Sequence, residues 1–328
     1  MKQFDTHRIF NINNADEFDT LALDVFGFQY ENNKVYQQFC DHLKKTPQNV
    51  SHHLQIPFLP ISFFKTHRVL STQKKAHTIF TSSGTTQSIT SKHFVPEIKI
   101  YEDSFLKAFK AFYGSPKDFC ILALLPSYLE RKGSSLIYMV NSLIEKSEHP
   151  SSGFYLNNLD ELHQKLNNLD KSGKKTLLIG VSFALLDLAE QFPMRLKNTI
   201  VMETGGMKGR RKELIREELH QILKQGLGVN KIHSEYGMTE LLSQGYSKGE
   251  GVFETPPWMK IITRDTEDPL TIQPNGKTGG INVIDLANIY SCSFIATQDL
   301  GKTYSNGAFE VLGRFDDSDI RGCNLMVL

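Results

Sequence analysis

The stretch Thr81-Ser82-Ser83-Gly84-Thr85-Thr86 places five hydroxyl side chains and one glycine within six residues. It follows the segment Thr78-Ile79-Phe80, which predicts the end of a strand. Glycine lets the backbone approach a ligand, and hydroxyls and successive N–H groups can point at negatively charged oxygens. The stretch is not a Walker loop, because no Gly-Lys-Ser/Thr follows it. We interpret it as a loop that binds nucleotide phosphates, and an exposed turn is the alternative.

Apolar segments and helical patterns alternate downstream of this loop. Continuous apolar runs predict buried strands at 119–125, 176–180 and 198–202. An amphipathic helix is expected from Arg211 to Lys224, with Leu214, Ile215 and Leu219 among its inward residues and Gly226 as its stop. Buried strands that alternate with helices indicate an α/β fold with a parallel sheet covered on both faces.

The two ends of the chain show other patterns. Residues 1–45 predict two helices, with Asn14 capping the first and Cys40 as a small core residue in the second. Short strands separated by Gly, Asn and Asp predict antiparallel β structure beyond about residue 250. We therefore expect an α/β nucleotide- and acyl-binding part at 1–250 and an antiparallel β subdomain at 251–328.

Composition excludes several classes of protein. Of 328 residues, 40% are hydrophobic and 22% charged, which is typical of a globular protein with a sizeable core. The net charge of +1 gives no field that would favour nucleic acid as a partner. The sequence shows no signal peptide and no apolar run long enough to span a membrane. The four cysteines lack metal-type spacing, so a reducing cytoplasmic location is expected.

Four later stretches carry residues suited to a nucleotide. In His233-Ser234-Glu235-Tyr236-Gly237-Met238-Thr239-Glu240, the Tyr236 ring could stack on a purine at the Gly237 turn. Thr239 and Glu240 could address a phosphate and, through a metal ion, its charge. Asp299 could accept both ribose hydroxyls. The remaining stretches are Gly313-Arg314-Phe315-Asp316-Asp317 and Glu203-Thr204-Gly205-Gly206. Each one alone is more typical of an ordinary turn.

The order of these motifs resembles that of the adenylate-forming (acyl-CoA synthetase-like) superfamily over roughly residues 57–328. Three further segments are similar to the acyl-protein synthetase (LuxE-type) branch, and phenylacetate-CoA ligases are the next most similar group. These segments are Phe63-Phe64-Lys65, Pro256-Pro257-Trp258-Met259 and Ile320-Arg321-Gly322-Cys323-Asn324-Leu325-Met326.

The resemblance implies ATP and Mg²⁺ as cofactors and assigns roles to individual residues. Tyr236 with Gly237 would stack on adenine, Thr239 and Glu240 would serve the α-phosphate and the magnesium ion, and Asp316 would lie at a hinge. Asp299 would hold the ribose and Arg314 would contact ribose or phosphate, although Gln298 replaces the usual glycine beside them. The phosphate-binding residues would be Ser82, Ser83, Gly84, Thr85 and Thr86.

The resemblance also implies a departure at the C-terminus. Typical relatives continue past the hinge into a mobile domain with a catalytic lysine, and we expect that domain to be absent here. Lys65, Lys208 or a partner would then supply the cation. In the LuxE-type branch a C-terminal cysteine accepts the acyl group as a thioester, which points to Cys323, although a core role for Cys323 is equally open.

These features together predict ATP-dependent activation of a carboxylic acid, most simply a fatty acid, as acyl-AMP. The acyl group would pass to Cys323, to a carrier protein or to CoA, with an acyl reductase or transferase as a further possible partner. Ser182, Gly205 and Gly206 are the candidate acid-binding residues. The alternatives are a non-catalytic subunit that binds acyl-adenylate and an aryl-CoA ligase. A hydrolase is not favoured, because the chain lacks a Gly-x-Ser-x-Gly elbow.

Overall fold

The computed structural model describes residues 4–82, 89–126, 133–205 and 214–314. These residues fall into two compact units, each described by itself. The first unit contains residues 1–77, 91–96 and 257–328, and the second contains 78–90 and 97–256. The units differ from the expected division at residue 250, because the N-terminal helices pack with the C-terminal strands.

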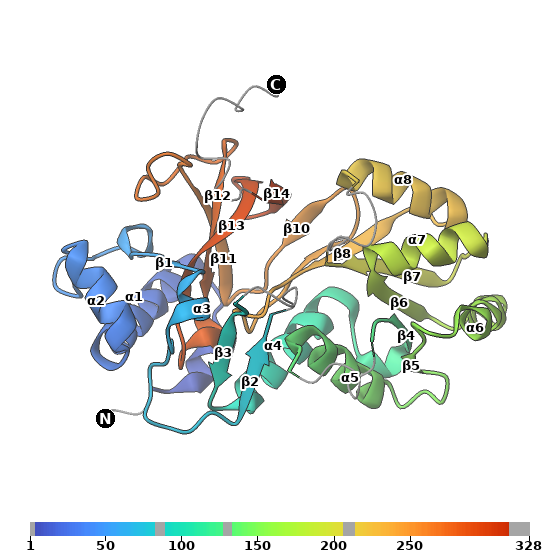
Figure 1. Ribbon diagram of the computed structural model, residues 1–328, viewed down its shortest axis with the longest axis horizontal. Coiled ribbons are helices and arrows are strands. Elements are labelled where there is room, and N and C mark those ends of the chain that lie inside the picture. Colours follow the sequence, from blue (N-terminus) through green and yellow to red (C-terminus); the bar gives the residue numbers. More distant parts are fainter. Residues whose placement is uncertain (1–3, 83–88, 127–132, 206–213, 315–328) are drawn as a thin grey trace. The chain divides into compact units, whose positions relative to one another are not determined.

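The second unit is built on a parallel sheet, as the alternating pattern predicts (Figure 1). Its order is β8-β7-β6-β4-β5, and β9 and β10 extend it antiparallel from β8. The antiparallel pairing thus begins at residue 245 rather than beyond 250. The strands are β2 (Thr78–Thr81), β4 (Cys120–Leu124), β5 (Gly153–Phe154), β6 (Thr176–Val181), β7 (Thr199–Thr204), β8 (Ile232–Tyr236), β9 (Gly245–Ser247) and β10 (Val252–Glu254).

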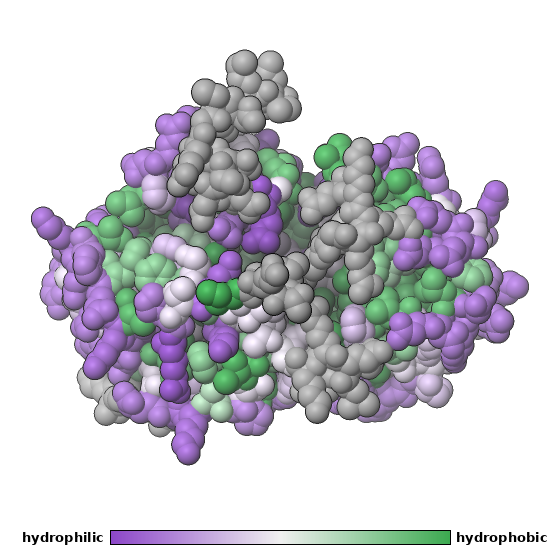
Figure 2. All heavy atoms as spheres, viewed as in Figure 1, coloured by the Kyte–Doolittle hydropathy of each residue, from purple (hydrophilic) through white to green (hydrophobic). Residues whose placement is uncertain are grey.

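Helices cover both faces of this sheet (Figure 1). Helices α6, α7 and α8 bury Leu166, Leu185 and Leu223 against Leu178 and Val201 of the strands. On the other face, Tyr113 of α4 reaches His233 of β8. Hydrophilic side chains gather along the outer edge that carries α6 and α8 (Figure 2). The helices are α4 (Ile98–Tyr113), α5 (Ser135–Ser147), α6 (Leu159–Lys171), α7 (Ser182–Gln191) and α8 (Arg216–Leu227), with a 3₁₀ turn η3 (Pro116–Asp118).

Helix α8 differs from its prediction at both ends. It begins at Arg216, so Ile215 precedes the first turn and is 69% exposed rather than inward. It continues through Gly226 to Leu227, and Gly228 caps it in a left-handed conformation with φ +65°. A Cβ at position 226 would lie 2.8 Å from the Cβ of Ala189 in α7. Gly226 therefore permits close helix packing instead of ending the helix.

The first unit combines the N-terminal helices with an antiparallel sheet of order β11-β12-β13-β14 (Figure 1). The short strand β1 pairs parallel with β13. The strands are β1 (Leu59–Pro60), β3 (Lys92–Val95), β11 (Met259–Arg264), β12 (Thr278–Asp285), β13 (Phe294–Thr303) and β14 (Phe309–Arg314). The helical segments are η1 (Thr6–Asn11), α1 (Ala15–Asn32), α2 (Lys34–His42), η2 (His53–Gln55), α3 (Phe63–Thr66) and η4 (Leu286–Asn288).

Side chains from α1 and α2 join the two ends of the chain in this unit. Asn14 caps α1 as predicted, since its side chain accepts a hydrogen bond from the Glu17 N–H. The buried amide of Gln29 donates to the carbonyl of Asn288 at 3.0 Å and accepts from the Ser293 N–H at 2.9 Å. The Tyr36 ring stacks on Phe294. Of the helices described, none has both the length and the apolar character that a membrane span requires.

Candidate active site

The entrance to the predicted phosphate loop is held beside the start of a helix. The Thr81 N–H, at the end of β2, donates to the Gly133 carbonyl at 2.8 Å. Gly133 has φ +83°, and a Cβ there would lie 3.1 Å from Thr81 Oγ1. Ser134 follows as the N-cap of α5, and the N-terminus of a helix favours a nearby anion. Ser82 is partly buried, whereas Ser83, Gly84, Thr85 and Thr86 lie outside the described residues.

The predicted adenine-binding turn follows β8 directly. Tyr236 is the last residue of that strand and is 8% exposed, with its ring against Phe253. Gly237 is exposed, and the Leu241 N–H donates to the Met238 carbonyl at 3.1 Å, which closes the turn. Thr239 is partly buried and Glu240 is only 5% exposed. The motif thus forms one compact turn at the carboxyl end of a parallel strand, where ligands of α/β sheets bind.

The predicted acid-binding residues that the structure describes lie close together. Ser182, at the start of α7, donates from Oγ to the Gly205 carbonyl at 2.7 Å. Its hydroxyl also lies 3.5 Å from Oε2 of Glu203. This contact joins the start of α7 to the end of β7. Gly206 lies outside the described residues.

Glu203 is the centre of a buried polar cluster that the sequence analysis did not identify. Its Oε1 lies 3.9 Å from Arg216 Nε and 3.7 Å from His220 Nε2. These distances are too long for direct hydrogen bonds, and His220 Nε2 is buried with no hydrogen-bond partner. Arg216 and His220 lie four residues apart on one helix. This spacing could have predicted that they share a face of the helix.

Glu235 lies on the face of the sheet opposite Glu203 and is buried. Thr204 Oγ1 donates to its Oε2 at 2.5 Å. Burial, together with the nearby Glu203, raises the pKa of Glu235 to about 7, although the Thr204 hydrogen bond acts in the opposite direction. Burial also lowers the pKa of His233 to about 4, with Lys248 and Lys231 adding to the effect. Glu235 and His233 are therefore both mostly uncharged in mildly acidic solution.

In the first unit, the predicted ribose and phosphate residues face each other across two strands. Asp299 of β13 and Arg314 of β14 are register partners, and Arg314 Nε lies 3.4 Å from Asp299 Oδ1. Arg314 Nη2 donates to Gln298 Oε1 at 3.4 Å. Gln298, which departs from the family pattern, thus contacts the exposed arginine.

A buried arginine on β11 links the neighbouring strands β12 and β13 and was missed by the sequence analysis. Arg264 donates from Nη1 to the Ile281 carbonyl at 2.8 Å and from Nη2 to the Thr297 carbonyl at 2.6 Å. A Cβ at Gly280 would lie 2.7 Å from its Cζ, so glycine leaves space for the guanidinium. The only sequence signal was one charged residue at the end of the apolar strand Met259–Arg264.

The remaining predicted residues divide into one exposed lysine and several undescribed positions. Lys65 has an exposed side chain on α3. Lys208, Asp316 and Cys323 lie outside the described residues. The other three cysteines, Cys40, Cys120 and Cys292, are buried.

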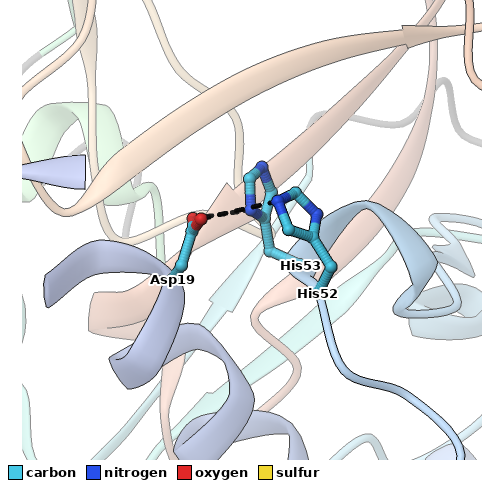
Figure 3. Close-up of side chains that lie close together, drawn as sticks. All are labelled: Asp19, His52 and His53. Atoms are coloured by element: carbon cyan, nitrogen blue, oxygen red, sulfur yellow. Dashed lines mark ion pairs between the residues drawn. The ribbon is translucent and has the colours of Figure 1, made fainter. Parts of the chain in front are cut away.

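A metal-type cluster lies in the first unit at Asp19, His52 and His53 (Figure 3). His53 Nδ1 is 2.6 Å from Asp19 Oδ1, which is shorter than the separation of about 3.3 Å that tetrahedral zinc ligands require. Lys260 Nζ lies 3.8 Å from the same oxygen, and His52 Nδ1 already accepts from the Leu54 N–H. Burial and Lys260 lower the pKa of His53 to about 4. The arrangement fits an ion-pair cluster in which Lys260 supplies the positive charge.

Comparisons with known proteins agree with the motif order. The sequence model described as "Acyl-protein synthetase, LuxE" matches residues 11–328. A Vibrio harveyi protein described as "Long-chain-fatty-acid--luciferin-component ligase" is 23% identical over 93% of this chain and 85% of its own length.

Solved structures share the fold at low sequence identity. A 2-hydroxyisobutyryl-CoA ligase in complex with 2-HIB-AMP matches with a TM-score of 0.67 and 12% identity, over 96% of this chain and 74% of its own. ATP-bound MatB from Rhodopseudomonas palustris matches with a TM-score of 0.54 and 17% identity, over 72% of this chain. The matched region is 47% of MatB, so the chain corresponds to about half the length of that enzyme.

Proposed function

The chain belongs to the acyl-protein synthetase (LuxE) family, and from this membership we propose that it activates a carboxylic acid with ATP and transfers the acyl group to a thiol. The observation that carries the proposal is the family match over residues 11–328. In the first step a carboxylate oxygen attacks the α-phosphorus of ATP, the bond to pyrophosphate breaks, and acyl-AMP forms. In the second step a thiolate attacks the acyl carbon and AMP leaves.

Several residues are proposed to bind the nucleotide. Ser82 to Thr86 would hold the phosphates, beside the start of α5. Tyr236 and Gly237 would face the adenine, and Asp299 would accept the ribose hydroxyls with Arg314 nearby. The compact turn after β8 and the contact between Asp299, in the middle of β13, and Arg314 support these assignments, since each brings polar groups together.

Magnesium is proposed as the metal of the reaction. Glu240 offers carboxylate oxygens, which are the ligands that Mg²⁺ prefers, and Thr239 lies next to it. A bound Mg²⁺ would neutralise charge on the phosphates as pyrophosphate leaves. Lys65 is the described lysine proposed as a cation for the adenylation step, and its exposed side chain is free to turn toward a ligand.

A fatty acid is the proposed substrate, because the Vibrio harveyi relative is described as a ligase of long-chain fatty acids. Ser182, Gly205 and Gly206 would lie beside it. The Glu203 cluster brings charge close to Ser182, so the part of the acid near this point would be its polar carboxylate end rather than its apolar chain.

Cys323 is proposed as the thiol that accepts the acyl group. The other three cysteines are poor nucleophiles, because burial raises their thiol pKa values, that of Cys40 to about 12. Alternative acceptors are CoA and the thiol of a carrier protein, with an acyl reductase or transferase as a later partner.

Labelled acid distinguishes these acceptors. With ATP and a carboxyl-labelled fatty acid, label should remain on the denatured wild type and on Cys120→Ser, and should be lost from Cys323→Ser. Label retained by Cys323→Ser would exclude Cys323. Product that requires added CoA would instead identify a CoA ligase, and ATP binding without any product would identify a non-catalytic subunit.

A further inference from the structure

Glu235 carries a buried carboxyl group for which the reaction as described has no use. It is the fourth residue of β8 and lies between register partners on both neighbouring strands, Thr204 of β7 and Tyr246 of β9. Thr204 donates the 2.5 Å hydrogen bond to Oε2. The carboxyl group is therefore fixed to the end of β7.

The second oxygen of Glu235 lies directly against the predicted adenine-binding turn. A Cβ at position 237 would lie 2.5 Å from Glu235 Oε1, closer than real Cβ contacts occur. Gly237 is not among the residues with positive φ, so its backbone conformation does not call for glycine. A side chain at this position would instead displace the Glu235 carboxyl group. Gly237 is exposed and Glu235 is buried, so the carboxyl group contacts the turn from the interior of the unit.

The groups around Glu235 bring no described positive charge to it. They are Thr204 and Glu203 on β7, Tyr246 on β9 and Tyr113 on α4. A structural carboxylate would normally be expected to face a cation. An uncharged carboxyl group instead acts as a compact hydrogen-bonding spacer, and its length sets the separation between β7 and the turn.

We propose that Glu235 is a positioning residue of the nucleotide site, which fixes the Tyr236–Gly237 turn against the end of β7 through Thr204 on one oxygen and Gly237 on the other. The inference rests on the proposed function, which assigns adenine binding to this turn. Thr204, which donates to this carboxyl group, is the last residue of β7. The next residue, Gly205, accepts the hydrogen bond from Ser182, so the turn and Ser182 are linked through the end of β7.

A double-mutant cycle tests the contact with Gly237. Gly237→Ala should weaken binding of a fluorescent ATP analogue by about tenfold or more, because its methyl group displaces the carboxyl group. In a Glu235→Ser background the same substitution should lower affinity for the analogue by less than about threefold, since serine leaves room for the methyl group. Gly27→Ala is the matched control, because a Cβ there meets nothing within 4 Å.

Conservative variants separate positioning from a contribution to stability alone. Glu235→Gln keeps the size and the acceptor for Thr204, so its affinity for the analogue should stay within about threefold of wild type. Thr204→Val removes the donor and should weaken binding by about fivefold or more at temperatures where both proteins are folded. Melting temperatures recorded in parallel define that range.

Two results would overturn the inference. One is that Gly237→Ala lowers affinity for the ATP analogue equally in wild type and in Glu235→Ser. The other is that Thr204→Val leaves this affinity unchanged although its melting temperature is lowered. A folded wild type that binds no ATP analogue would reject the proposed function itself, and with it the assignment on which this inference rests.

Discussion

Asp299 and Arg314 are register partners on β13 and β14, with Nε of the arginine 3.4 Å from Oδ1 of the aspartate. Asp299 is 9% exposed, whereas the Arg314 side chain is 67% exposed. An ion pair with one exposed partner contributes little to stability, generally less than about 1 kcal/mol. Under the proposed function the pair would instead serve ligand binding, with a fixed carboxylate for the ribose and an extended cation for the ribose or a phosphate.

Replacing Asp299 by Asn should weaken ATP binding by about tenfold, because the carboxylate proposed to accept the ribose hydroxyls loses its charge. The proposed contact also predicts that wild type binds 2′-deoxy-ATP more weakly than ATP. Asp299→Asn should largely lose that preference. Glu267→Gln, at an exposed position in the same unit, is the control. Equal discrimination between the two nucleotides in wild type and variant would remove Asp299 from the ribose site.

Replacing Arg264 by Met should lower the free energy of unfolding by about 3 kcal/mol, because the Ile281 and Thr297 carbonyls lose a buried charged donor. Urea denaturation measures the loss, with Lys277→Ala at an exposed position as the control. A change below about 1 kcal/mol would show that solvent or rearranged neighbours replace the guanidinium.

The buried Glu235 predicts a specific dependence of stability on pH. Its pKa is raised from 4.5 to about 7, so between these values the unfolded chain loses a proton that the folded chain keeps. Wild type should therefore lose stability, on the order of 3 kcal/mol, as pH rises from 4 to 8, relative to Glu235→Gln. The relative loss should be complete above about pH 7 and absent below the unfolded pKa.

Urea denaturation of both proteins across this range makes the comparison. The exposed Glu254→Gln serves as a control for the loss of an ordinary carboxylate. If the free energies of unfolding of wild type and Glu235→Gln differ by the same amount at every pH, the pKa of Glu235 does not change on folding.

The cluster of Asp19, His52 and His53 in Figure 3 should respond to the charge of Lys260 and not to metal ions. Lys260→Met should raise the pKa of His53 toward its ordinary value, because the Lys260 charge is one cause of its depression. Chelators and added Zn²⁺ should leave the melting temperature unchanged. Histidine NMR titration measures the first effect, and thermal unfolding measures the second. Stabilisation by Zn²⁺ that disappears in His53→Gln would instead establish a metal site.

The sequence allowed much of the fold to be predicted, because the decisive signals are local. Continuous apolar runs marked β4, β6 and β7, and Asn14 marked the start of α1. Gly226 was misread as a helix stop, because a glycine required for helix packing and a glycine that ends a helix look the same in a sequence. The sequence does not show which α-helix packs against Gly226 in the folded protein.

The candidate site was only partly predictable, for a similar reason. Tyr236, Thr239 and Glu240 lie at and just after the end of one strand and could be identified together. Arg264 and Glu235 act through partners that lie far away in the sequence, in β12 and β13 for the arginine and in β7 for the glutamate. Periodicity shows which face of a strand a residue lies on, but not which strand will be its neighbour.

The most direct test of the proposed activation is a single-turnover reaction with labelled ATP and a panel of fatty and aryl acids, resolved for every nucleotide product. The account predicts pyrophosphate in an amount equal to acyl-AMP and AMP together, formed only when an accepted acid is present and reduced in Asp299→Asn. Formation of ADP and phosphate would contradict it, as would the absence of product with every acid from a chain that demonstrably binds ATP.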